Sequence, residues 1–245
     1  MPPSLRILGS RVDPVTAQSA LEQILTFLDN GEPHHVITGN TLMFLLAQKD
    51  QELHAILEKA ALVVPESWGV RWASRIHGQA LTQFTPGIDF VLEICRAAEA
   101  GGHSVFLLGS APGVAEEAGQ ALKARFPGLQ VVGTGHGYFK APEEPSVIRR
   151  VRESKPSILF VGMGMPAQEK WIARNLQALN VPVVMGVGGS FDVLSGRLRR
   201  APAWIRQLGV EWSYRLLQEP WRWRRILQLP VFAWKVWWEK QHGKW

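Results

Sequence analysis

Residues 158–176, ILFVGMGMPAQEKWIARNL, decide the fold class. They begin with the apolar run Ile158–Gly162, pass through a glycine-containing turn and continue over 167–176 with apolar residues three and four positions apart. The first pattern predicts a strand buried on both faces, and the second predicts an amphipathic helix that packs against it. A strand, a turn and a helix in this order form the building block of a parallel sheet.

The same unit recurs along most of the chain. Apolar runs predict strands at 6–8, 35–38, 62–64, 105–108, 130–132, 158–162 and 183–187. Amphipathic stretches between them predict helices that include 16–28, 89–98, 113–126, 146–153 and 167–176. We therefore predict an open, doubly wound, Rossmann-like α/β fold with right-handed crossovers.

Composition limits the class of protein. The 245 residues are 46% hydrophobic and 20% charged, which is ordinary for a globular chain with an ample core. One cysteine excludes a disulfide framework and a cysteine zinc site. The longest nearly uncharged stretch, 181–191, has about half of the roughly 20 residues that a membrane span needs, so no span is expected.

Charge and tryptophan divide the chain in two. Residues 197–245 hold 11 Lys and Arg against 3 Glu, and 8 of the 11 tryptophans, whereas 1–196 carry a net charge of −2. We predict an α/β core over 1–196 and a basic helical appendage over 197–245. Within the appendage, helices are expected at 204–217 and 221–229, and Pro230 is expected to break or kink the chain before 231–240.

Three predicted strands end in glycine-rich turns, at 108–113, 161–166 and 185–190. In an open parallel sheet these turns lie where ligands bind, and the helix that follows each offers free N–H groups to a phosphate. Three such turns favour a nucleotide or phosphorylated ligand, although turns of this kind favour glycine anyway. The chain lacks both GxGxxG and GxxxxGK[ST], so neither a dinucleotide site nor a P-loop is indicated.

Polar residues next to these turns are candidates for chemistry. Glu66 directly follows a strand and could act as a general base, or it could simply cap a helix. The other candidates at strand ends or helix starts are Thr38, Asn40, Gln168, Glu169, Lys170 and Asp192.

No metal site is expected from the sequence. The histidines lack paired-ligand spacing, and there is no Asp-x-Asp. Asp50 and Glu52 fall where a helix should begin, so helix capping is the favoured interpretation. Cys95 lies in an apolar helix and is expected in the core.

The appendage admits three interpretations. Interleaved Arg and Trp could bind nucleic acid, or they could lie at a membrane interface with indoles at headgroup level. A third interpretation packs the appendage on the core with arginines near a diphosphate, which is compatible with the second. A rough apolar stripe, which favours the membrane, consists of Trp223, Leu227, Pro230, Trp234 and Trp237.

Nine motifs along the chain carry a resemblance to one family. They are TGN at 38–40, PESWG at 65–69, PGID at 86–89, FLLG at 106–109, GHGYF at 135–139, GMGMPAQEKW at 162–171, GVGGSFD at 186–192, RRAP at 199–202 and EWSYRLLQEP at 211–220. Together they resemble the WecG/TagA/CpsF family, glycosyltransferase family 26, over about residues 7–229.

This resemblance implies a metal-independent, inverting transferase without a cofactor. It would move an N-acetylmannosamine-type or glucose-type sugar from a UDP-sugar to a polyprenyl-diphosphate-linked saccharide, for cell-surface polysaccharide or teichoic-acid-type synthesis. It also implies a peripheral location at the inner, cytoplasmic face of the plasma membrane, where the appendage would contact anionic lipid. The oligomeric state stays open, with a homo-oligomer as one alternative.

The resemblance also implies roles for individual residues. Glu66, Thr38 and Asn40 would form the catalytic set. The substrate-binding set would be Gly109, Gly137, Gly164, Gln168, Gly188, Asp192, Arg215, Arg222 and Arg225. The chain departs from the family twice, because Glu66 stands where Asp is usual and Phe84 where Arg is frequent. These departures leave a non-catalytic, membrane-peripheral nucleotide-sugar-binding protein as the alternative, with a nucleic-acid-binding protein as a further rival.

Overall fold

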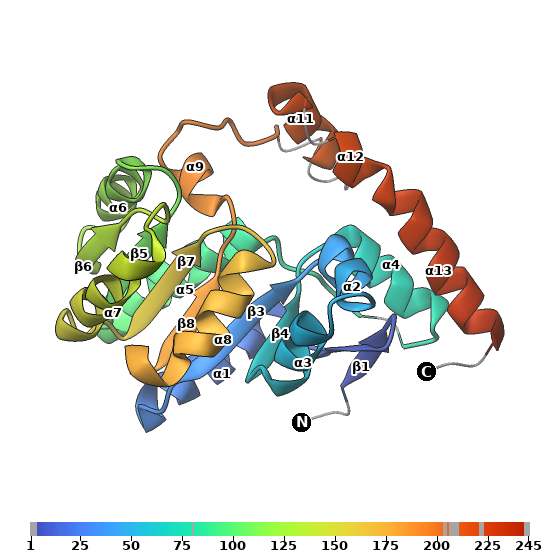
Figure 1. Ribbon diagram of the computed structural model, residues 1–245, viewed down its shortest axis with the longest axis horizontal. Coiled ribbons are helices and arrows are strands. Elements are labelled where there is room, and N and C mark those ends of the chain that lie inside the picture. Colours follow the sequence, from blue (N-terminus) through green and yellow to red (C-terminus); the bar gives the residue numbers. More distant parts are fainter. Residues whose placement is uncertain (1–3, 80, 203–204, 206–210, 221–222, 243–245) are drawn as a thin grey trace.

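The computed structural model describes residues 4–79, 81–202, 205, 211–220 and 223–242, and it confirms the predicted fold class. Six parallel strands form one sheet in the order β4-β3-β8-β7-β5-β6 (Figure 1). Their bounds are β3 His34–Gly39, β4 Leu62–Pro65, β5 Ser104–Gly109, β6 Gln130–Gly135, β7 Ile158–Gly162 and β8 Val183–Gly186.

Helices cover both faces of the sheet, as the continuous apolar strands require. On one face, a core cluster joins the strands to α1 (Ala17–Asn30), α5 (Gly87–Gly101) and α6 (Val114–Arg125). On the other face lie α7 (Glu144–Glu153) and α8 (Ala167–Leu179) at one side, and α2 (Thr41–Ala47), α3 (Gln51–Lys59) and α4 (Trp68–Ile76) at the other.

The strand expected at 6–8 is present, but it lies outside the parallel sheet. It forms β1 (Leu5–Ile7), which pairs antiparallel with β2 (Ser10–Val12). A tight turn at Leu8 and Gly9, both with positive φ, joins the two strands. A two-residue turn of this kind permits only an antiparallel hairpin, which explains why the expectation of a seventh parallel strand is wrong.

Side-chain caps fix where the helices next to β3 and β4 begin. Asn40 caps α2, Asp50 caps α3 through the N–H of Leu53, and Ser67 caps α4. The capping interpretation of Asp50 is therefore confirmed, and Cys95 is fully buried in the core as expected. Capped helix starts hold the residues that follow each strand in fixed positions.

The described part of the appendage is helical, and its helix α13 runs along the side of the body beside α2 and α4 (Figure 1). Its described helices are α11 (Glu211–Gln218), α12 (Trp223–Ile226) and α13 (Gln228–His242). The break expected at Pro230 is wrong, because Pro230 lies in the first turn of α13, where its missing N–H costs no hydrogen bond. Phe232 and Val236 are buried in the same core cluster as α2 and α4.

None of the helices described here has the length and apolar character that crossing a membrane requires. The domain boundary at 196/197 stays a prediction.

Candidate active site

A cavity of about 1040 Å³ opens at the carboxyl ends of the parallel strands. After β3 the chain crosses to β4 at one edge of the sheet, and after β5 it crosses to β6 at the opposite edge. In open parallel sheets, ligands bind where the direction of these crossings changes. The cavity brings together Thr38, Asn40, Glu66, Gly137, Gly164, Gln168, Gly188, Asp192, Arg215 and Arg225. These are the predicted site residues with two exceptions.

Gly109 and Arg222 are the exceptions. Gly109 is the last residue of β5, and the cavity wall begins at the next residue, Ser110. A Cβ at Gly109 would collide with the Gly162 backbone, so this glycine permits the close approach of β5 and β7. Arg222 lies outside the described residues.

Glu66 lines the cavity and is held there by hydrogen bonds from two neighbours. Its Oε2 accepts a hydrogen bond from Asn40 Nδ2 at 3.2 Å, and its Oε1 accepts one from the Gly87 N–H at 3.3 Å. Asn40 can present only its amino group, because its Oδ1 accepts the N–H groups of Leu42 and Met43 at the start of α2. Glu66 therefore has a fixed orientation before any substrate binds.

The surroundings of Glu66 tune its protonation. Burial raises the pKa of Glu66, while hydrogen bonds from Asn40, the Gly87 N–H and Thr38 and the positive charge of Arg215 oppose that rise. Its carboxylate also faces the N-terminus of α5, whose dipole favours negative charge. A carboxylate whose pKa is raised, but that keeps donors to its charged form, is suited to general-base chemistry near neutral pH.

Gln168 ties two glycine turns together. Its side chain is 4% exposed, and its Oε1 accepts hydrogen bonds from the N–H groups of Gly164 at 3.1 Å and Gly188 at 3.0 Å. Both glycines have positive φ, which places their turns in a conformation that other residues rarely adopt. Gln168 thereby sets the shape of the wall between β7 and β8.

Glu169 lies behind Gln168, deeper in the protein. It is 1% exposed, and its Oε1 accepts a hydrogen bond from Gln168 Nε2 at 2.7 Å. Burial raises the pKa of Glu169 to about 7, and the negative charge of Glu66 adds to that rise. Lys170 points elsewhere and forms ion pairs with Asp50 and Glu52, so it is not part of the cavity.

Asp192 and Arg215 meet at the turn after β8. Asp192 Oδ2 accepts a hydrogen bond from Ser110 Oγ at 3.2 Å. A Cβ added to Gly189 would lie 3.2 Å from Arg215 Nη2 and 3.6 Å from Asp192 Oδ2, so both side chains line this turn. Because Arg215 belongs to α11, the appendage brings a cation to the edge of the cavity.

Two ion pairs hold the start of the appendage to the core. Arg197 binds Glu117 at 2.7 Å, and Arg200 binds Asp89, which lies in the first turn of α5. Asp89 and Arg200 both line the cavity. They were not among the predicted site residues, although both lie in family motifs.

Among the residues that the structure describes, no group of three or more His, Cys, Asp or Glu side chains stands close enough to hold a metal.

His35 is buried, and burial lowers its pKa to about 3, which keeps the ring neutral.

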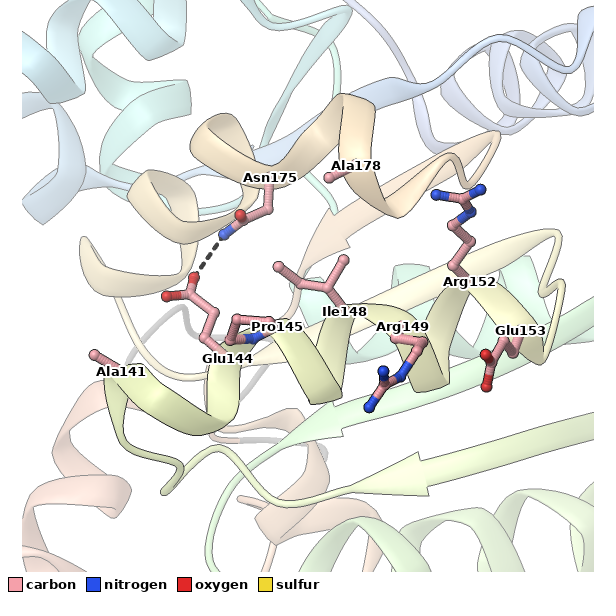
Figure 2. A pocket seen from close by; sticks show the side chains of 9 residues that line it. All are labelled: Ala141, Glu144, Pro145, Ile148, Arg149, Arg152, Glu153, Asn175 and Ala178. Atoms are coloured by element: carbon pink, nitrogen blue, oxygen red, sulfur yellow. Dashed lines mark hydrogen bonds between the residues drawn. The ribbon is translucent and has the colours of Figure 1, made fainter.

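A second groove, of about 700 Å³, lies between α7 and α8 (Figure 2). One hydrogen bond crosses it, from Asn175 Nδ2 to Glu144 Oε1 at 2.8 Å. None of the predicted site residues that the structure describes lines this groove, so the larger cavity is the candidate active site.

Comparison with known proteins identifies the family. The model of the glycosyl transferase WecG/TagA/CpsF family matches residues 5–244. The chain belongs to this family of glycosyltransferases. Its similar relatives include proteins named N-acetylglucosaminyldiphosphoundecaprenol N-acetyl-beta-D-mannosaminyltransferase from three Staphylococcus aureus strains, MW2, NCTC 8325 / PS 47 and MRSA252. Each is 35% identical to this chain over 232 residues, which cover 94% of this chain and 91% of the relative.

This membership makes the chain an enzyme that transfers a sugar. It thus resolves the alternatives left open by the sequence in favour of a glycosyltransferase. The cavity described above is where the fold and the family motifs coincide.

Proposed function

We propose that this transferase moves an N-acetylmannosamine-type sugar from a UDP-sugar to a polyprenyl-diphosphate-linked N-acetylglucosamine. The relatives named above support the acceptor and the transferred sugar. The observation that carries the proposal is the fixed Glu66 carboxylate in a cavity shared with glycine turns and with Arg215. This arrangement provides a base and partners for a diphosphate within one cavity.

The reaction would be a direct displacement at the anomeric carbon. A hydroxyl oxygen of the acceptor forms the new bond to that carbon and gives its proton to Glu66. The bond from the carbon to the UDP oxygen breaks, and UDP leaves with the electron pair from the opposite face. This course inverts the configuration. Asn40 and Thr38 would hold Glu66 and the transferred sugar in register.

Negative charge develops on the departing diphosphate. The appendage arginines Arg215 and Arg225, which line the cavity, would stabilise it together with backbone N–H groups of the glycine turns other than those of Gly164 and Gly188, which donate to Gln168. Asp192 would contact the nucleoside, and Gln168 would keep the donor wall in shape. Under this proposal the enzyme needs neither a metal ion nor another cofactor.

The appendage would also place the enzyme on the membrane that carries its acceptor. Its outward side chains include Trp223, Leu227, Trp234 and Trp237, each more than half exposed. Exposed indoles beside basic residues suit the headgroup region of an anionic bilayer. We propose that the enzyme is peripheral to the plasma membrane and works at its cytoplasmic face.

A transfer assay tests the proposed function. The purified protein is incubated with N-acetylglucosaminyl-diphosphoundecaprenol and each of several UDP-sugars, including UDP-N-acetylmannosamine and UDP-glucose. We expect a lengthened lipid-linked saccharide with the N-acetylmannosamine donor. UDP binding without transfer from any donor would instead favour the non-catalytic alternative.

A further inference from the structure

The cavity has two halves that differ in chemistry. The half formed by the turns after β5, β6, β7 and β8 is rich in glycine and contains Asp192. The other half is formed by the ends of β3 and β4 and the starts of α2, α4 and α5, and Glu66 lies there. This second half also holds the apolar side chains of Leu42, Met43, Trp68, Trp72 and Phe84, and the appendage adds Ile226, Leu229 and Phe232 to the cavity wall.

Three aromatic side chains from two elements line this second half, and we call them the aromatic wall: Trp68, Trp72 and Phe84. Trp68 and Trp72 are four residues apart on α4 and therefore share one face of that helix. Trp68 is 52% exposed, whereas Trp72 and Phe84 are partly buried. A half-exposed indole inside a cavity wall offers a flat apolar surface to a ligand.

The backbone that carries Trp68 is held firmly. Ser67 caps α4 through the N–H of Val70, and its Oγ lies 2.9 Å from Thr41 Oγ1. Gly69, which follows Trp68, packs closely on Thr41, and a Cβ at position 69 would collide with the Thr41 hydroxyl. These contacts fix the start of α4 against α2, so the exposure of the Trp68 side chain is built into the fold.

The segment that carries Phe84 is held to the same strand end as Glu66. The N–H of Thr85 donates to the carbonyl of Pro65 at 2.9 Å, and the N–H of Gly87 donates to Glu66 itself. The aromatic wall and Glu66 are therefore parts of one rigid arrangement around the end of β4.

From this arrangement we propose that the aromatic wall binds the terminal sugar ring of the acceptor, with Trp68 stacked on the apolar face of the ring. The inference rests on the proposed function. In the displacement described above, UDP leaves from one side of the anomeric carbon and the acceptor arrives from the other. With UDP in the glycine-rich half, the acceptor must occupy the half that contains Glu66 and the aromatic wall.

The position of Trp68 next to Glu66 favours contact with the acceptor's sugar ring rather than with its polyprenyl chain. The reacting hydroxyl must reach Glu66, and Trp68 is only two residues further along the chain. In a lipid-linked saccharide the polyprenyl chain is separated from that hydroxyl by the sugar ring and the diphosphate. The polyprenyl chain therefore belongs further out, toward Ile226 and Leu229 of the appendage.

Steady-state kinetics of Trp68→Ala and Trp68→Phe test this proposal. We expect Trp68→Ala to raise the acceptor KM roughly tenfold, the size of one lost stacking contact. Trp68→Phe should restore most of that loss, because a phenyl ring keeps a flat surface. The affinity of both variants for UDP should equal that of the unaltered protein, whereas Gln168→Ala should show the reverse pattern and weaken UDP binding first.

Two acceptors show whether Trp68 contacts the sugar or the lipid. One is N-acetylglucosaminyl diphosphate attached to undecaprenol, and the other is the same group attached to a short alkyl chain. The proposal requires the Trp68→Ala effect with both. An effect confined to the undecaprenyl acceptor would overturn it and assign Trp68 to the lipid, and an unchanged acceptor KM would also overturn it.

Failure of the proposed function would look different from failure of this inference. If the unaltered protein transferred no sugar to either acceptor, the function itself would be wrong. If the unaltered protein did transfer sugar, and Trp68→Ala were as efficient as the unaltered protein with both acceptors, only the proposed role of the aromatic wall would be wrong.

Discussion

Replacing Glu169 by glutamine tests whether this buried carboxyl is uncharged in the folded protein. Glu169 is 1% exposed and accepts one hydrogen bond, from Gln168. Burial, helped by the charge of Glu66, raises its pKa from 4.5 to about 7. Glutamine has nearly the same shape and cannot ionise, so it mimics the protonated acid.

The sign of the effect follows from proton linkage. Between pH 4.5 and about 7 the folded protein retains a proton on Glu169 that the unfolded chain has released. Stability contributed by this group is therefore lost as the pH rises through that window, and the loss is complete above about pH 7. The difference between the two pKa values corresponds to about 3 kcal/mol, which is an upper bound for such a buried group.

Other groups titrate in the same range and must be separated from Glu169. Burial lowers the pKa of His35 to about 3 and that of His77 to about 4, so both histidines make stability rise with pH up to about 6.5. Burial raises the pKa of Glu66, which acts in the same direction as Glu169. The histidine contributions are present with and without the substitution, so the difference between the two proteins reports Glu169 together with its coupling to Glu66.

Urea unfolding at intervals from pH 4.5 to 8.5 measures this difference. We expect Glu169→Gln to gain stability relative to the unaltered protein as the pH rises, with a plateau above about pH 7. Glu22→Gln, on the outer face of α1, serves as the control and should show no such trend. A Glu169→Gln difference that stays constant with pH would refute the assignment of a neutral Glu169.

Three further results are expected. Gly87→Ala should lower kcat roughly tenfold or more, because a Cβ there would lie 2.8 Å from Glu66 Oε1, whereas Gly119→Ala, where a Cβ makes ordinary contacts at 3.4 Å, should leave kcat unchanged. Transfer should persist in excess EDTA, and abolition that Mg²⁺ reverses would contradict the metal-independent mechanism. Replacing both Trp234 and Trp237 by serine should reduce the fraction of protein that co-sediments with anionic vesicles. If that fraction were unchanged, these tryptophans would not form the membrane-binding surface.

Much of the fold was predictable because the buried strands are continuous apolar runs. The six parallel strands and α1, α5, α6, α7 and α8 follow from hydrophobic periodicity alone. The hairpin at the N-terminus was not predictable in this way, because a three-residue strand looks alike in a parallel and an antiparallel sheet. The course of α13 through Pro230 depends on where the helix begins, and tertiary contacts of Phe232 and Val236 decide that.

The sequence predicted residues that line the candidate site, but not how their side chains contact one another. Strand ends and glycine turns marked Glu66, Asn40 and Gln168 correctly as cavity residues. The sequence could not show that the side-chain oxygen of Gln168 accepts the N–H of Gly188, or that the N–H of Gly87 donates to Glu66, because these contacts join residues 20 and 21 positions apart. PGID at 86–89 is the sequence signal that could have identified Gly87, which was not among the predicted site residues.

Single-turnover transfer by Glu66→Gln, measured beside its affinity for UDP, shows whether Glu66 is the general base. We expect unchanged UDP binding and a transfer rate lower by roughly 10²- to 10⁴-fold, since only the proton acceptor is lost. Glu22→Gln should transfer at the unaltered rate. A Glu66→Gln protein that transferred the sugar as fast as the unaltered enzyme would contradict the claim that Glu66 is the base.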